Sequence, residues 1–159
     1  MIMKMTRVAM LLVLPLLAVL LPMASSSAGN EAAAAAVQFT YVNVVIDPHD
    51  RPLAAYQLSV VLTTPDAQIV GIEGGDSAAF NAAPYYDPAA LQKQKVILAA
   101  YSLNAAKDLP AAKTRVARLH LQLPANATAR FTTELNVAAT TDGAAIAHAT
   151  ASLQPGENP

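Results

Sequence analysis

The sequence predicts an all-β protein, an antiparallel two-sheet β-sandwich, on two observations. From Val37 onward, apolar and polar residues alternate with a period of two in one segment after another, as in strands that bury one face. Clusters of Pro, Gly, Asp and Asn separate these segments at short intervals, and no amphipathic helix of useful length interrupts them. Strands that each bury one face require a second sheet to cover them, so a sandwich is the expected architecture.

The first 28 residues have the three parts of a secretory signal. Lys4 and Arg7 form a positively charged start, an apolar run covers residues 8–21, and residues 26–28 offer a small-x-small cleavage site, with Ala24 as an alternative end. The apolar run is shorter than the ~20 residues of a membrane-spanning helix, and prolines interrupt it. We therefore expect a cleaved signal and a secreted or extracytoplasmic protein, in the periplasm or at the cell surface. Only an uncleaved signal would attach it to a membrane.

The composition of the mature chain excludes several functional classes. Cleavage after Ala28 removes two of the 10 cations and none of the 11 acids, which leaves a net charge of −3 and no reason to expect a nucleic-acid partner. The absence of Cys excludes thiol catalysis, thiolate zinc sites and iron–sulfur clusters. Residues 29–36 contain five consecutive alanines and no large apolar side chain, so they are predicted to be an Ala-rich linker.

Three strands are predicted in the first half of the domain. Residues 38–46 are rich in Val, Tyr and Phe and end in the turn sequence Asp-Pro-His-Asp-Arg-Pro. Residues 53–64 carry apolar side chains at the even positions 56–62 and polar ones at 57, 59 and 63. A Pro-Asp turn leads into residues 68–73, which two glycines close. The acids and the histidine of the first turn could ligate a metal ion, but the loop supplies too few ligands for calcium or zinc, and we expect no metal site.

The middle of the chain is predicted to contain an irregular stretch and then a buried strand. Two prolines within residues 76–94 forbid a regular strand there, and residues 89–92 are expected to form one helical turn after Pro88. Residues 95–103 include a run that is apolar on both faces, which is typical of a central strand.

Three strands are predicted in the last third. Residues 113–123 place Arg, His and Gln opposite a row of apolar side chains, and residues 130–140 alternate Phe, Thr, Leu and Val with polar residues. Thr-Asp-Gly at 141–143 indicates a hairpin to a strand over residues 144–153, and residues 154–159 are expected to be a tail. The domain is thus predicted to span residues 37–153 with seven or eight strands.

Several of these segments, in this order, resemble the cohesin family of β-sandwich modules, whose relatives include carbohydrate-binding modules. The resemblance begins with Pro-Leu-Ala-Ala-Tyr-Gln-Leu-Ser-Val at 52–60 and Ile-Val-Gly-Ile-Glu-Gly-Gly at 69–75, and continues through 96–101 and 114–121. It covers about residues 38–153. It implies a nine-stranded, cohesin-like sandwich with jelly-roll topology that docks a protein partner, such as a dockerin module, through one sheet face. No binding residue follows from it by position.

The first candidate binding residues are Tyr85, Tyr86 and Asp87, which two prolines bracket. Tyrosines on a rigid loop offer a large contact area at low entropic cost and suit a sugar ring or a protein partner. The alternative is that one or both tyrosines fold back to cover one end of the core.

The second candidate group is Arg118, His120 and Gln122, which point away from the core side of their strand. If this strand pairs with residues 130–140, they share a face with Thr132, Glu134 and Asn136. Such a hydrogen-bonding face suits partner docking, although a solvated sheet face has the same pattern.

These observations favour an exported, non-catalytic binding module without a cofactor. Neither a nucleophile elbow nor a phosphate-binding or dinucleotide-binding motif is present in the sequence. The first interpretation is docking of an extracellular or envelope protein. The alternative is binding of a polysaccharide, and the absence of Trp makes this interpretation weaker than the first. The third interpretation is a structural or assembly domain of the cell envelope.

Overall fold

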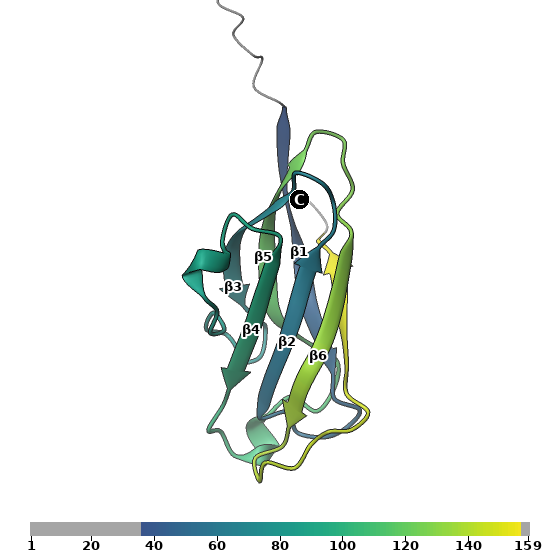
Figure 1. Cartoon of the computed structure of the whole chain (residues 1–159). Helices are drawn as coiled ribbons and strands as arrows, with labels where there is room; N and C mark the ends of the chain where they lie inside the picture. The colour runs from purple at the N-terminus through teal and green to yellow at the C-terminus, as the bar shows by residue number, and fades with distance from the viewer. Residues whose placement is uncertain (1–35, 157–159) are drawn as a thin grey trace, which may run out of the picture. The chain divides into compact units, whose positions relative to one another are not determined.

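The computed structural model describes residues 36–156, which form an all-β domain and confirm the predicted fold class (Figure 1). The predicted signal, all of the predicted linker except Ala36, and residues 157–159 of the predicted tail lie outside the described residues. Among residues 36–156, no helix is long and apolar enough to cross a membrane.

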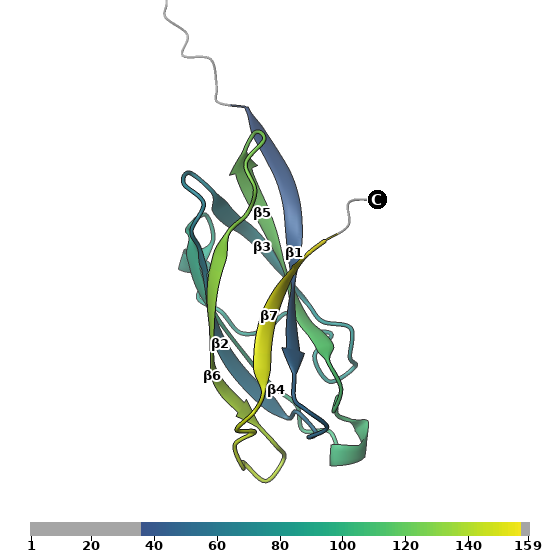
Figure 2. The same ribbon diagram turned by 90° about the vertical axis from the view of Figure 1, so that its right-hand side faces the viewer.

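Seven strands alternate between two antiparallel sheets, and Figure 2 shows these two layers. The four-stranded sheet has the order β3-β5-β1-β7 and the three-stranded sheet the order β4-β2-β6. The strands are β1 (Val37–Asp47), β2 (Ala55–Leu62), β3 (Gln68–Gly74), β4 (Lys95–Tyr101), β5 (Thr114–Pro124), β6 (Phe131–Ala139) and β7 (Thr150–Pro155). Each strand is thus followed by a strand of the other sheet. The described residues contain fewer strands than the nine that the cohesin resemblance implies, and the jelly-roll topology stays a prediction.

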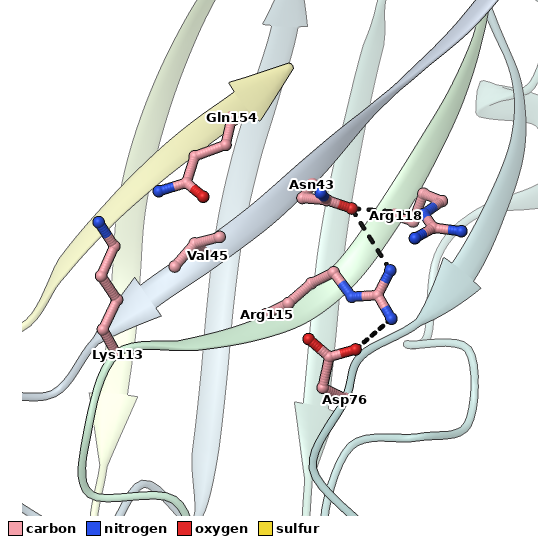
Figure 3. Close-up of a pocket in the computed structure, with 7 residues that line it drawn as sticks. All are labelled: Asn43, Val45, Asp76, Lys113, Arg115, Arg118 and Gln154. Carbon is pink, nitrogen blue, oxygen red and sulfur yellow. Dashed lines mark hydrogen bonds and ion pairs between the residues drawn. The ribbon is translucent and has the colours of Figure 1, made fainter. Parts of the chain in front are cut away.

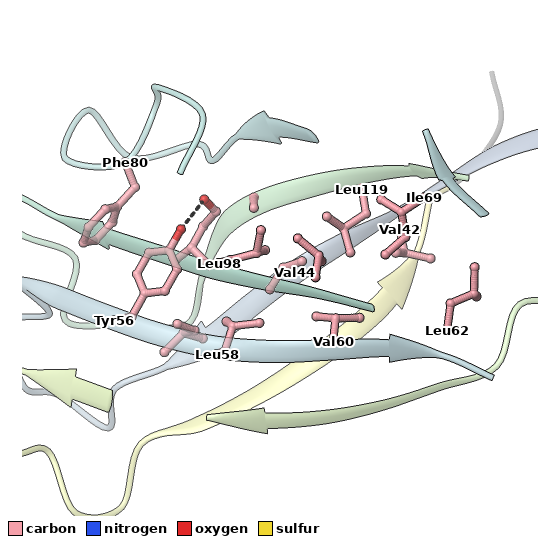
Figure 4. Packing of buried hydrophobic residues seen from close by; sticks show 14 of the residues in the cluster. Val42, Val44, Tyr56, Leu58, Val60, Leu62, Ile69, Phe80, Leu98 and Leu119 are labelled. Carbon is pink, nitrogen blue, oxygen red and sulfur yellow. Dashed lines mark hydrogen bonds between the residues drawn. The ribbon is translucent and has the colours of Figure 1, made fainter. Parts of the chain in front are cut away.

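The inward side chains of the two sheets form one apolar core, part of which Figure 4 shows. Leu58 of β2 and Leu119 of β5 are completely buried, as the period-two patterns of their strands predict. Tyr56 brings a polar group into this core. Its hydroxyl donates a hydrogen bond to the backbone carbonyl of Val116 (3.2 Å), and its ring packs edge-on against Phe80.

β-Bulges in β5 and β6 change which side chains reach the surface. Val116 is an extra residue of β5 opposite Val44 and Val45 of β1, and Asn136 is an extra residue of β6 opposite β2. A one-residue insertion exchanges the two faces of a strand beyond it. Val137, which simple alternation places in the core, is therefore 43% exposed.

The prediction of a fully buried central strand over residues 95–103 was wrong. This segment forms β4, which lies at the edge of the three-stranded sheet. Val96 and Leu98 are buried, whereas Ile97 is 49% and Tyr101 is 61% exposed. The pattern misled because a run that is apolar on both faces does not distinguish two buried faces from one buried and one exposed apolar face.

The predicted hairpin after residue 140 forms only in part. Ala145 pairs with Ala139 in an antiparallel bridge and the N–H of Ile146 donates to the carbonyl of Ala138 (2.8 Å), but the predicted strand over residues 144–153 does not continue along β6. The N–H of Gly143 donates to the carbonyl of Thr140 (3.0 Å) with a positive φ of 80°, so the chain does reverse there. The following residues then cross to the other sheet, where β7 begins only at Thr150 and pairs with β1. Gln154 and Pro155, which were expected in the tail, belong to this strand.

Candidate functional site

The structure separates the two predicted groups of binding residues onto opposite faces of the sandwich. Tyr85 lies beside β4 of the three-stranded sheet, whereas Arg118, His120 and Gln122 lie on β5 of the four-stranded sheet. The predicted shared face with Thr132, Glu134 and Asn136 does not form, because those residues belong to β6 in the other sheet. Periodicity fixes which side of a strand a residue occupies but not which strand lies beside it.

Tyr85 extends the three-stranded sheet beyond its edge strand. Its N–H donates to the carbonyl of Ala99 (2.7 Å) and its carbonyl accepts from the N–H of Ala99 (3.0 Å). This pairing places the Tyr85 ring beside that of Tyr101, with parallel planes (7°) and centroids 6.2 Å apart. Tyr85 is 68% exposed, so the backbone holds two aromatic rings side by side in contact with solvent.

The outward side of the three-stranded sheet, together with Tyr85, forms a nearly uncharged surface that we call the tyrosine face. Cross-strand pairing places its side chains in rows. They are Ala55, Gln57, Ser59 and Val61 of β2, Lys95, Ile97, Ala99 and Tyr101 of β4, and Thr132, Glu134, Val137 and Ala139 of β6. Only Lys95 and Glu134 carry charge in this set. Ile97 of β4 and Val137 of β6 add exposed apolar side chains to the two tyrosines, and the polar Gln57 and Ser59 of β2 lie between them.

Tyr86 and Asp87 make contacts that support the fold, whereas Tyr85 is exposed. Tyr86 is half-buried and packs against the core, so the alternative of covering the core applies to it alone. The Asp87 carboxylate accepts a hydrogen bond from the N–H of Ala89 (2.9 Å) and caps the short 3₁₀ helix η1 (Pro88–Ala90). This helix is the helical turn predicted after Pro88.

The outward side of the four-stranded sheet carries charged residues that contact one another. Nε2 of His120 lies 2.9 Å from Oε1 of Glu73 on β3, and the Arg118 guanidinium lies over the Tyr41 ring, 4.4 Å from its centroid. The Arg118 guanidinium also lies 3.6 Å from the Glu73 carboxylate. Gln122, the third predicted residue of this strand, is half-buried. The prediction that these β5 side chains point outward is confirmed.

A polar pocket of about 550 Å³ opens on this second face, and Figure 3 shows its lining. We call it the arginine pocket; it is lined by Asn43, Val45, Asp76, Lys113, Arg115, Arg118 and Gln154. Arg115 reaches it because the bulge at Val116 places Arg115 on the same side as Arg118. The Arg115 guanidinium pairs with the Asp76 carboxylate and donates to Oδ1 of Asn43 (3.4 Å).

The described residues offer no metal centre. No group of three or more His, Asp or Glu side chains in residues 36–156 is arranged to hold a metal ion.

The turn after β1 is formed as its sequence predicts. His49 and Asp50 have positive φ angles of 49° and 62°, and the N–H of His49 donates to Oδ1 of Asp47 (3.0 Å).

Several residues of both surfaces escaped the sequence reasoning. Tyr101 and Ile97 were assigned to a buried strand, and no role was given to Arg115. A signal for Tyr101 existed, because it ends an alternating Lys-x-Ile-x-Ala-x-Tyr series that matches the exposed side of an edge strand. Nothing in the sequence pattern marks the bulge that turns Arg115 outward.

Comparison of this chain with family models, curated proteins and solved structures yields no match. The cohesin-like resemblance therefore stays a prediction, and function is inferred from the two surfaces.

Proposed function

We propose that this chain is an exported, non-catalytic binding module that docks an extracellular or envelope protein through its tyrosine face. The observation that carries this proposal is the gathering of Tyr85, Tyr101, Ile97 and Val137, each at least 43% exposed, on one almost uncharged sheet face. Several exposed large apolar side chains gathered on one face commonly mark an interaction site.

The chemistry of the face suits a protein partner. Interface centres are depleted of charged residues and enriched in tyrosine, and here the two charged residues, Lys95 and Glu134, lie away from the tyrosine pair. Tyr101 is fixed in β4, and two backbone hydrogen bonds fix Tyr85 against it. Since these rings are positioned before binding, little entropy is lost when a partner docks on them.

Polysaccharide binding is the second candidate, and one observation favours it. The parallel rings of Tyr85 and Tyr101 could stack on a sugar chain. The surface beyond them is formed by Ile97, Ala99 and Val137, which provide no further aromatic ring. A protein partner would use this aliphatic area, whereas a sugar chain would use little of it, so protein docking ranks first.

The test is capture by the purified, immobilised chain from secreted and envelope extracts of the source organism, with calcium and with chelator. Two variants accompany the wild type: Ile97→Glu within the tyrosine face, and Phe39→Glu on the other sheet as a matched change at an exposed apolar residue. We expect a specific protein that wild type and Phe39→Glu retain and Ile97→Glu loses.

The same preparations, together with a third variant, Tyr101→Ala, also decide between the candidates. Retardation in polysaccharide-containing gels that Ile97→Glu leaves unchanged and Tyr101→Ala abolishes would replace protein docking by carbohydrate binding. Capture that is equal for all the variants would refute the tyrosine face as the docking surface. If the chain binds copies of itself and forms a stable oligomer, this would support the third interpretation, an assembly domain.

A further inference from the structure

The arginine pocket holds a guanidinium whose hydrogen-bonding capacity is only partly used. The Arg115 side chain is 18% exposed and is fixed by Asp76 and Asn43. Its Nε atom is buried and has no hydrogen-bond partner in residues 36–156. Each terminal nitrogen of the guanidinium carries two N–H groups and makes one of these bonds, so one N–H on each remains for an acceptor in the pocket.

Positive charge in the pocket exceeds the negative charge that faces it. Arg118 donates from Nε to the same Asn43 oxygen that Arg115 uses (3.3 Å), so a neutral amide oxygen is shared by two cations. Lys113 also lines the pocket and has no ion pair within the part of the chain that the structure describes. Asp76 is the one carboxylate in the lining, against three cations, and Glu73 lies outside the lining, 3.6 Å from Arg118 and 2.9 Å from His120.

We propose that the arginine pocket binds a carboxylate side chain of an acidic peptide segment. A guanidinium matches a carboxylate with two parallel N–H donors, and Lys113 at the same pocket adds a point charge. The amides of Asn43 and Gln154 add neutral hydrogen-bonding groups to the lining. Both guanidiniums are oriented before a ligand arrives. Asp76 and Asn43 orient Arg115 (Figure 3), and the Tyr41 ring orients Arg118.

A peptide carboxylate fits this pocket better than an acidic sugar does. The nearest aromatic ring is that of Tyr41, and the Arg118 guanidinium covers one side of it. The ring also packs so closely on Gly156 that no Cβ atom could be accommodated at residue 156. No ring is therefore free for a saccharide to stack on, and the lining itself contains no aromatic residue.

This site is independent of the proposed function, because it opens on the four-stranded sheet and the tyrosine face lies on the other sheet. Either one can fail in experiment while the other holds.

The test is titration of the purified chain with an end-blocked tetraglutamate peptide, followed by calorimetry and by NMR of the arginine side-chain Nε–H groups. A tetraglutamine peptide is the matched uncharged probe, and tetragalacturonate tests the saccharide source. We expect shifts of the Arg115 and Arg118 Nε–H signals, and binding that weakens strongly between about 0.02 M and about 0.3 M salt because the contact is electrostatic.

Three variants make the assignment specific. Lys113→Gln changes an exposed residue without an ion pair in residues 36–156, so it is expected to fold normally and to weaken tetraglutamate binding about threefold. Arg118→Gln removes a charged donor, with an expected loss of about tenfold. Lys95→Gln removes a cation from the opposite sheet and is expected to leave binding unchanged.

The proposal is overturned by undetectable tetraglutamate binding, by equal binding of tetraglutamine, or by a loss in Lys95→Gln equal to that in Lys113→Gln. Tighter binding of tetragalacturonate than of tetraglutamate, lost in Lys113→Gln, would assign the pocket to an acidic saccharide instead. If Arg118→Gln is unstable, the Nε–H signals of the wild-type chain still show whether tetraglutamate contacts Arg115 and Arg118.

Discussion

Replacing Tyr56 by Phe tests how the core supports the bulge that orients Arg115. The Tyr56 hydroxyl donates to the carbonyl of Val116, the extra residue of β5, at 3.2 Å. Removing the hydroxyl leaves that buried carbonyl without this donor, which costs about 1–3 kcal/mol of unfolding free energy. For a domain of this size, 1 kcal/mol corresponds to about 3–6 °C, so we expect a melting temperature lower by about 5–15 °C near pH 7.5.

The pH dependence of this variant gives a sharper test. Burial disfavours the phenolate and raises the pKa of Tyr56 well above its ordinary value of 10.0. Above pH 10 the unfolded chain ionises this hydroxyl while the folded domain keeps its proton, so stability is full below pH 10 and falls as the pH rises. The slope is about 1.4 kcal/mol for each pH unit.

Tyr56→Phe lacks this titration, so its deficit should shrink by about 1 kcal/mol between pH 10 and pH 11, where the unfolded hydroxyl passes from half ionised to almost fully ionised. Urea unfolding followed by circular dichroism at pH 8, 9, 10 and 11 measures both proteins, with far-UV spectra at pH 11 confirming that each is folded. A deficit that stays constant from pH 8 to pH 11 would refute the reasoning, because it would mean that Tyr56 is not buried as a hydrogen-bonded phenol.

Other substitutions test the core, the loop and one turn. Leu58→Ala is expected to cost about 3 kcal/mol because the side chain is completely buried, whereas exposed Leu103→Ala should change stability by less than about 0.5 kcal/mol in the same thermal unfolding assay. Tyr86→Ala should cost about 2 kcal/mol and Tyr85→Ala less than about 0.5 kcal/mol, and a reversed order would contradict the separation of core and surface roles. A hydrogen bond from the Thr140 hydroxyl lowers the pKa of Asp142, so the ionised carboxylate stabilises the fold above the ordinary carboxyl pKa and this contribution is lost as the pH falls. Asp142→Asn should therefore melt at a lower temperature than wild type at pH 7 and at the same temperature at pH 2.5. An equal difference in melting temperature at both pH values would exclude this linkage.

The fold class could be predicted because period two is a local property of the chain. The outward positions of Arg118 and His120 on β5 follow directly from it, as does the burial of Leu119 between them. Strand order could not be predicted in the same way. The pairing of β5 with β1 and β3, rather than with β6, depends on contacts between distant segments that alternation does not encode.

The composition of the surfaces escaped prediction for a more specific reason. The bulges at Val116 and Asn136 each depend on the backbone of one residue, and each exchanges the faces of the residues beyond it. Arg115 and Val137 therefore reach surfaces from which strict alternation excludes them. Ile97 shows a second limit, because an exposed apolar residue and a core residue look alike in sequence.

Hydroxyl-radical footprinting of the chain with its captured partner tests the central claim most directly, since this method reports solvent access at individual tyrosine side chains. Docking through the tyrosine face predicts that Tyr85 and Tyr101 lose most of their labelling when the partner is bound, while Tyr41 and His120 on the other sheet keep theirs. Unchanged labelling of Tyr85 and Tyr101 in the complex, with protection of Tyr41 and His120, would place the docking surface on the four-stranded sheet and contradict the account.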